Sequence, residues 1–325
     1  MINDFESYES IKKWKERKIY SCLSNATLLN QLHDSVMNMV FEVASIRLNK
    51  GNPPCSFSWF VTGSGGRYEQ GLISDQDHGI IFEISSSENE EFFIELGREI
   101  SFGLDIVGYP YCQGNIMSSN PTWCKSLEQW RTQLLIWMEK NSWDTIRNLQ
   151  IFYDARHLHG TDSYVDELKS FIYNYQKKHP MLLKRLIENV MHIKRSVGPL
   201  GQIIVEEHGE HQGSIDLKYA AFLPYVNAIR ILAIKEGLTE TSTLVRIDRL
   251  CQIKKYGEVL QSMKSNFQKL LDYRLSLTHI QSYKDTHFLN IKNLHSQEKK
   301  EIKRILKDGK KLHHYVCELV EKGCE

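Results

Sequence analysis

Two acidic residues beside a glycine-rich turn are the part of this sequence best suited to chemistry. The stretch WFVTGSGGRYEQGLISDQDHGIIF spans residues 59–82, and ten residues separate Gly63-Ser64 from the pair Asp75 and Asp77. On an extended strand these two side chains share a face, about 6.6 Å apart along the chain. Two such charges repel by about 4 kcal/mol at about 4 Å and an effective dielectric of about 20. The pattern therefore predicts a divalent cation between them.

The glycine turn and Arg67 are suited to binding phosphate beside that cation. Glycine allows positive φ and a close approach of the backbone to a ligand. The turn at Gly63 and Ser64 can present N–H groups and a hydroxyl to phosphate oxygens, and Arg67 can add bidentate contacts. The alternative for Arg67 is a structural ion pair with Glu69 or another carboxylate. Together these residues predict a metal–triphosphate site.

Asp154 is the candidate for a third carboxylate. It ends a compact apolar run, Leu149–Tyr153, that we interpret as a third strand. A pair of catalytic metal ions needs several converging carboxylates, and a general base must lie within hydrogen-bonding reach of the acceptor proton. Asp154 is therefore predicted as a metal ligand and as the group that helps to deprotonate an acceptor. The alternatives are a strand-end cap and a salt bridge to Arg156.

The first half of the chain alternates helices and strands around this stretch. Apolar residues recur at helical spacing in residues 26–49, and Asn52-Pro53-Pro54 ends that pattern. Residues 108–123 are rich in Gly, Pro, Asn and Ser, so we expect a long loop, which inside a domain is often functional. Trp123, Trp130 and Trp137 recur every seven residues and predict a helix packing face. The other predicted helices cover residues 8–23, 88–107, 125–139 and 144–148.

The second half is predominantly helical. A small β-hairpin is predicted near residues 202–218, where β-favouring residues precede the turn HGEHQG. We expect an α+β fold: a nucleotide-site domain with a small mixed β-sheet flanked by helices, followed by a mainly α-helical bundle. The predicted parts are N-terminal helices (1–50), the α/β domain (51–164) and the helical domain (165–325). The predicted helices of this half are 162–177, 180–196, 217–236, 240–252, 255–281 and 297–321.

The motif GSGGRYEQGLISDQD resembles the signature of the DNA polymerase beta-like nucleotidyltransferase superfamily. More narrowly, it is similar to the nucleotidyltransferase domain of bacterial signal-transduction proteins, which is related to the uridylyltransferases of the PII regulatory protein. The likeness continues through residues 108–124, IFYDARHLHG and IDLKYAAFLPYVNAIR, and so covers roughly residues 30 to 320. The chain has Ala220-Ala221 where related chains often have Gly-Gly, and His78 where they often have Asn.

The resemblance implies a Mg²⁺- or Mn²⁺-dependent enzyme that moves an NMP group from an NTP to an acceptor hydroxyl and releases pyrophosphate. It implies metal on Asp75, Asp77 and Asp154, and triphosphate on Gly63, Ser64 and Arg67. Asp216 and Lys218 would face the cleft from the helical domain, with Lys218 contacting phosphate or pairing with Asp216. The acceptor would be a regulatory protein or a small molecule. The alternative function is a catalytically inactive, nucleotide-binding regulatory module.

Composition bears on the expected partners and on the cellular location of the protein. The formal net charge is +1, so bulk charge gives no reason to expect a nucleic-acid partner. The sequence has no apolar run long enough to span a bilayer, so we expect no membrane contact. The seven cysteines are scattered and form no CxxC motif, which indicates reduced thiols and a cytoplasmic protein. The long predicted helices would be able to support a homodimer.

Overall fold

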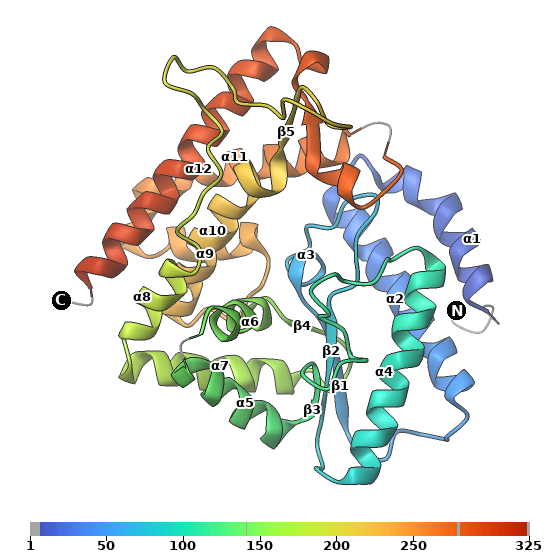
Figure 1. Ribbon diagram of the computed structural model, residues 1–325. Helices are drawn as coiled ribbons and strands as arrows, with labels where there is room; N and C mark the ends of the chain where they lie inside the picture. Colours follow the sequence, from blue (N-terminus) through green and yellow to red (C-terminus); the bar gives the residue numbers. More distant parts are fainter. Residues whose placement is uncertain (1–6, 141, 278–279, 324–325) are drawn as a thin grey trace. The chain divides into compact units, whose positions relative to one another are not determined.

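The chain forms two compact units, Met1–Ile172 and Tyr173–Glu325. The structure is a computed structural model that describes residues 7–140, 142–277 and 280–323. Figure 1 shows the course of the chain through both units. The expected fold class is confirmed, because the first unit contains a small mixed sheet with helices and the second is mainly helical.

A four-stranded sheet in the order β3-β2-β1-β4 is the centre of the first unit. Strand β1 (Phe57–Val61) pairs antiparallel with both β2 (His78–Phe82) and β4 (Arg156–Gly160), whereas β3 (Cys124–Ser126) lies parallel to β2. Every residue of β1 and β2 is buried. Helices cover both faces of the sheet, so successive residues of each strand are buried, including the polar Ser58 and His78.

Helices α1 (Tyr8–Ile19), α2 (Ala26–Leu48) and α4 (Ser87–Val107) lie on one side of this sheet, and α5 (Leu127–Lys140) and α6 (Trp143–Tyr153) lie on the other (Figure 1). Neighbouring residues of β1 face the two layers. The Trp59 ring stacks on Phe41 of α2, and Phe60 makes edge contacts with Trp130 and Phe152. Trp123, Trp130 and Trp137 contact one another, but only Trp130 and Trp137 lie on α5, whereas Trp123 lies in the turn before β3, so the predicted helix face holds for two of the three.

The predicted strand at Leu149–Tyr153 is wrong, because these residues form the last turns of α6. Ser142 caps this helix by accepting a hydrogen bond from the amide of Thr145, and Ile146, Leu149 and Phe152 recur at helical spacing on its buried side. A short apolar run does not distinguish a buried helix turn from a strand. The strand of this region is β4, which begins two residues after Asp154. The sequence interpretation also missed β3, the short strand before α5.

The second unit is built around α9 (Leu223–Glu236), a helix that is buried almost all round. Such a helix must be covered by neighbours on every side. Helices α8 (Met181–Glu188), α10 (Thr243–Cys251) and α12 (Ser296–Lys322) pack against it, and α11 (Lys254–Leu275) packs on α10 and α12. A π-helical turn, Lys218–Phe222, leads into α9. Helix α7 (Ser163–Lys178) contains the boundary between the two units.

The predicted hairpin near residues 202–218 is wrong in its pairing. Strand β5 (Ser214–Asp216) pairs antiparallel with β6 (Phe288–Asn290), a strand far along the chain. Of the predicted hairpin only the closing turn forms: the Glu206 amide donates to the Ser214 carbonyl and the Gly213 amide donates to the Glu206 carbonyl, each at 2.9 Å, but residues 202–205 form no strand beside β5. The predicted helix 180–196 also ends early, at Glu188, and a long segment without helix or strand follows to residue 213.

Candidate functional site

Asp75 and Asp77 lie in an extended segment directly before β2, not on the strand itself. The alternation predicted for a strand nevertheless holds there, because both aspartates are partly exposed whereas Gln76 and His78 are buried. Gln76 forms an isolated bridge with Tyr111 of the loop 108–123. The two carboxylates therefore share one side of the segment, as the spacing of two residues requires.

Buried polar residues hold this segment in place. The side-chain amide of Gln76 donates to the carbonyls of Ser101 and Tyr109 at 3.1 and 3.0 Å. His78 Nε2 bonds Gln76 Oε1 at 3.0 Å, and Nδ1 accepts from the Trp59 indole at 3.2 Å. Burial lowers the pKa of His78 to about 3, so the ring is neutral at pH 7, consistent with this pattern of one donor and one acceptor.

A second buried histidine fixes the two segments that approach the aspartates. His33 of α2 bonds the carbonyl of Gly71 through Nε2 at 3.0 Å and the hydroxyl of Tyr109 through Nδ1 at 2.7 Å. Gly71 lies on the segment before Asp75, and Tyr109 begins the loop 108–123. Burial and nearby Lys15 lower the pKa of His33 to about 3, although the bond to Gly71 opposes this shift. The site thus depends on two uncharged imidazoles.

The glycine turn forms a four-residue helical turn, α3 (Gly63–Gly66), which lies directly under the Asp77 carboxylate. Gly63 has φ of +58°, and a Cβ added there would overlap Asp77 Oδ2. A Cβ added at Gly66 would overlap the carbonyl oxygen of Asp154. The GSGG sequence is therefore required both for backbone conformation and for close packing. It brings the backbone that carries Ser64 next to Asp77 on one side and Asp154 on the other.

A cysteine that the sequence interpretation missed joins the two aspartates. Among the described residues, Asp75, Asp77 and Cys112 each offer one ligand atom, and these atoms lie within 4.8 Å of one another. The Cys112 thiol hydrogen-bonds to Asp77. Burial, followed by the charges of Asp77 and Asp75, raises the pKa of Cys112 to about 12. The only sequence signal for this residue was its place in a Gly- and Pro-rich loop of unusual length.

The donor set fits an oxygen-preferring divalent cation. Mg²⁺ in phosphate-binding enzymes is held by one or two carboxylates, with water and substrate phosphates completing the octahedron. Asp75 and Asp77 supply those carboxylates, both are partly exposed, and the Asp77 carboxylate packs against Gly63 in the space that a Cβ would fill. Asp75 and Asp77 are therefore the residues that would hold the metal.

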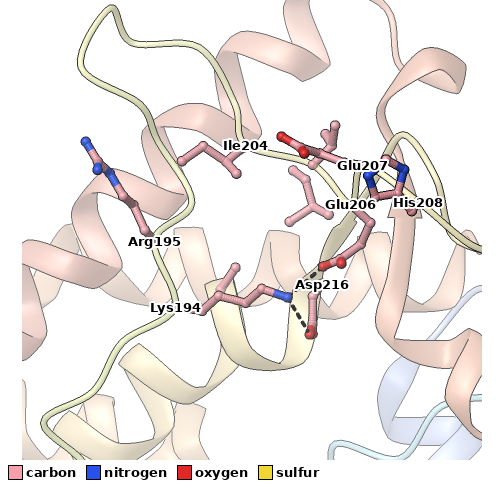
Figure 2. Close-up of a pocket in the computed structure, with 10 residues that line it drawn as sticks. Lys194, Arg195, Ile204, Glu206, Glu207, His208 and Asp216 are labelled. Atoms are coloured by element: carbon pink, nitrogen blue, oxygen red, sulfur yellow. Dashed lines mark hydrogen bonds and ion pairs between the residues drawn. The ribbon is translucent and has the colours of Figure 1, made fainter.

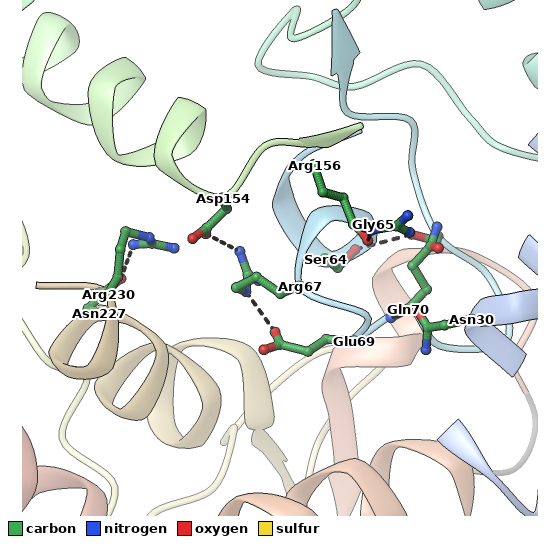
Figure 3. Close-up of polar contacts among 11 residues, drawn as sticks. Asn30, Ser64, Gly65, Arg67, Glu69, Gln70, Asp154, Arg156, Asn227 and Arg230 are labelled. Carbon is green, nitrogen blue, oxygen red and sulfur yellow. Dashed lines mark hydrogen bonds and ion pairs between the residues drawn. The ribbon is translucent and has the colours of Figure 1, made fainter. Parts of the chain in front are cut away.

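Asp154, the predicted third metal ligand, is held in an ion pair with Arg67. It is fully buried at the C-terminal cap of α6, and its Oδ2 accepts a hydrogen bond from Arg67 at 2.7 Å. Arg67 also pairs with buried Glu69 at 2.8 Å (Figure 3). Burial acts to lower the pKa of Arg67, but Glu69 and Asp154 raise it above its ordinary value. Asp154 is not a member of the Asp75–Asp77–Cys112 group.

A second arginine braces the glycine turn from outside. Arg156 of β4 donates from Nε to the carbonyl of Gly65 at 3.1 Å and pairs with Asp34 at 2.5 Å. Its guanidinium also lies 3.9 Å from the ring centre of Tyr68, a residue with φ of +58°. Burial raises the pKa of Asp34, and Arg156 opposes that shift. The predicted salt bridge between Asp154 and Arg156 is replaced by these contacts.

The remaining predicted residues are placed as follows. The Ser64 hydroxyl lies 3.3 Å from the hydroxyl of Ser74, at the edge of the glycine turn. Lys218 lies in the second unit, on the π-helical turn, with its ammonium 5.5 Å from the ring centre of Tyr283 and 5.9 Å from that of Tyr219. Asp216 accepts a hydrogen bond from the amide of Tyr219 and pairs with Lys194, not with Lys218.

The second unit contains a cavity of about 390 Å³ beside β5. Its walls come mainly from the irregular segment between α8 and β5, and its floor from β5 and the π-helical turn (Figure 2). Lys194 bridges Glu206 at 2.6 Å and Asp216 at 3.3 Å across the cavity. The lining residues are Lys194, Arg195, Ile204, Val205, Glu206, Glu207, His208, Ile215, Asp216 and Ala220. This volume is in the range of small-ligand sites.

Comparison with known protein families gives two matches. Residues 19–144 match the family described as "Putative nucleotidyltransferase DUF294", and residues 180–318 match the "Putative nucleotidyltransferase substrate binding domain". The first match contains the glycine turn, both aspartates and Cys112, and the second contains the cavity. No curated protein matches the chain. Within the described residues, no helix has both the length and the apolar character needed to cross a membrane.

Proposed function

Because the chain belongs to the DUF294 nucleotidyltransferase family, we propose that it transfers a nucleoside monophosphate from an NTP to an acceptor hydroxyl, with Mg²⁺ or Mn²⁺ and release of pyrophosphate. The observation that supports this most strongly is the packing of the Asp77 carboxylate on Gly63 with Asp75 beside it. A carboxylate pair placed directly above a phosphate-binding type of turn suits a bound metal–triphosphate.

Each proposed residue has a distinct task. Asp75 and Asp77 hold the divalent cation, which when bound neutralises phosphate charge and orients the reacting oxygens. The backbone of Gly63 and the hydroxyl of Ser64 bind phosphate oxygens beside Asp77. The reaction needs mainly positioning and charge stabilisation. The His33, Gln76 and His78 network supports that requirement, because it fixes the segment carrying both carboxylates.

Arg67 acts indirectly in this proposal. Its guanidinium is engaged by Asp154 and Glu69, so it serves as a brace between the glycine turn and α6. Direct contact between Arg67 and phosphate would require one of these ion pairs to open. The same argument applies to Asp154: its roles as a third ligand and as a base stay predictions that need release from Arg67.

The acceptor is proposed to bind in the cavity of the second unit. Two observations support this: the family description of residues 180–318 names substrate binding, and the cavity lies within that range. Its lining combines apolar side chains with acids and bases, as expected for a polar small molecule or a peptide side chain. Asp216→Asn would then reduce labelling of the acceptor while NTP and metal binding stay unchanged.

The proposal is tested by incubating the protein with α-³²P-labelled NTPs, Mg²⁺ or Mn²⁺, and a cell extract as the source of acceptors. We expect the wild-type protein to transfer the label to an acceptor. The Asp75→Asn and Asp77→Asn variants should form no labelled product. Both substitutions keep the side-chain size and remove a charge. Glu139→Gln is the matched control, because it removes an exposed carboxylate of α5.

The outcomes separate the candidate functions. Transfer that survives in both aspartate variants contradicts the proposed metal site. Tight NTP binding that needs Asp75 and Asp77, without transfer to any acceptor, would instead indicate the nucleotide-binding regulatory module. Calorimetry of each variant with Mn²⁺ and NTP provides the binding measurement, and a thermal melt shows whether each variant is folded.

A further inference from the structure

Cys112 is placed beside the proposed metal ligands by the backbone, not by chance contact of a mobile side chain. The amide of Gln76 donates to the carbonyl of Pro110 at 3.2 Å, and the amide of His78 donates to that of Ile116 at 3.1 Å. These two bonds flank Cys112 along the loop and flank Asp77 along the segment before β2. The loop and the metal-carrying segment therefore form one unit of structure, with the thiol and the carboxylates on the same side.

We propose that Cys112 Sγ is a third, sulfur ligand that makes this site bind thiophilic divalent cations in preference to Mg²⁺. The inference rests on the proposed function, because it takes Asp75 and Asp77 as the metal ligands. Mg²⁺ is a hard ion that selects oxygen, whereas Zn²⁺ and Co²⁺ bind thiolate sulfur readily. A site with two carboxylate oxygens and one sulfur within 4.8 Å of one another can therefore hold either class of ion with a different donor set.

The chemistry of the two bound states differs at one bond. With Mg²⁺, the two aspartates bind the ion and Cys112 stays a thiol, hydrogen-bonded to Asp77. With Zn²⁺ or Co²⁺, a metal–sulfur bond forms and the thiol proton passes to solvent, as metal binding to cysteine requires. No oxidation state changes. Zinc bound in this way occupies the position of Mg²⁺, so the two ions would compete for one site.

Cobalt spectroscopy tests the sulfur ligand without any measurement of activity. The full chain is titrated with Co²⁺, and we expect a sulfur-to-cobalt charge-transfer band in the near ultraviolet that is absent in Cys112→Ser and Cys112→Ala. Zinc affinity, measured by calorimetry, should fall at least about tenfold in both variants. Mn²⁺ affinity should change by less than about twofold. Cys251→Ser is the control, since Cys251 belongs to α10 of the second unit.

Each outcome bears on one proposal. A charge-transfer band that persists in both Cys112 variants, or equal zinc affinity in wild type and variants, overturns the sulfur ligand. The proposed function would stand in that case, provided that Asp75→Asn and Asp77→Asn still weaken Mn²⁺ binding. If these aspartate variants bind Mn²⁺ as tightly as wild type, the proposed metal site itself fails. Circular dichroism of Cys112→Ser and Cys112→Ala shows whether at least one is folded, because the two replacements differ in polarity and volume.

Discussion

At the scale of single residues, the segment before β2 alternates partly exposed carboxylates with buried side chains that carry no charge. Asp75 and Asp77 are partly exposed, whereas Gln76 and His78 between and after them are buried. This alternation lets one short segment present two carboxylates on its exposed side and pack into the core on its other side. Substitutions on the exposed side should therefore affect ligand binding, and substitutions on the buried side should affect folding.

Gly63→Ala should abolish metal binding at a small cost in stability. The new Cβ would displace the Asp77 carboxylate, and the positive φ adds a backbone cost of about 1–2 kcal/mol. Gly51→Ala is a close control, because Gly51 has φ of +76° and nothing within 4 Å of an added Cβ. Calorimetry with Mn²⁺ should show binding in the control only. Equal Mn²⁺ affinity in the two variants would contradict the close packing described above.

The two buried histidines of the site, His33 and His78, should contribute to the protein's sensitivity to mild acid. Their pKa values in the folded state are about 3, below the ordinary value of 6.5, so the unfolded chain binds more protons as the pH falls. The contribution of these two neutral rings to the free energy of unfolding is fully present above about pH 6.5 and is lost as the pH falls towards 3. Each histidine contributes a slope of about 1.4 kcal/mol per pH unit.

This slope is measured by urea unfolding between about pH 6 and pH 5, where few carboxylates titrate. His33→Gln and His78→Gln should each flatten the pH dependence by about one proton. His192→Gln, which replaces an exposed histidine of the second unit, is the matched control. A slope that stays the same in both buried-site variants would show that these rings are protonated in the folded protein.

At the scale of elements, the sequence predicts the helices well and the strand partners poorly. Helices α2 and α4 were predicted within one residue at each end, because caps and apolar spacing are local signals. Strand β5 could not be matched with β6, since pairing between distant segments leaves no local pattern. The error at Leu149–Tyr153 has a similar cause, because a five-residue apolar run is too short to show its period.

The candidate site likewise has a part that could be predicted from local sequence and a part that could not. The glycine turn and the two aspartates were predictable because they lie within fifteen residues of one another. Cys112 and the Asp154–Arg67 ion pair were not, because each depends on how distant segments pack. The loop 108–123 was expected to be functional, but no feature of its sequence shows which side chain approaches Asp77.

The crossing of α9 and α12 depends on one small residue. Gly309 of α12 packs on Tyr225, and an added Cβ would lie 2.5 Å from Cε2 of that ring. Gly309→Ala gains about 1 kcal/mol of helix propensity, but overpacking costs about 1–3 kcal/mol. We expect net destabilisation in urea unfolding. The same change in a Tyr225→Ala background should be neutral or stabilising; equal losses in both backgrounds would place the strain elsewhere.

At the scale of the whole molecule, the chain is held together without covalent cross-links among the described residues. The six cysteines within the described ranges, Cys22, Cys55, Cys112, Cys124, Cys251 and Cys317, are free thiols. We expect the protein purified without reductant, then unfolded in guanidinium, to react with a thiol reagent at all seven cysteines of the sequence. The measurement is the absorbance released by that reagent, and a value lower by two would reveal a disulfide.

Helix α7 has a consequence for dissecting the protein. The boundary between the compact units falls at Ile172 and Tyr173, inside a helix that runs from Ser163 to Lys178. Val165, Leu168 and Ile172 are buried in the first part of this helix. The ring of Tyr173 packs against Gly237, where an added Cβ would lie 2.8 Å from its Cζ. Recombinant fragments ending at residue 172 would thus cut the helix and expose apolar side chains. A fragment of either unit should therefore include the whole of α7, so that residues 163–178 are present in both fragments.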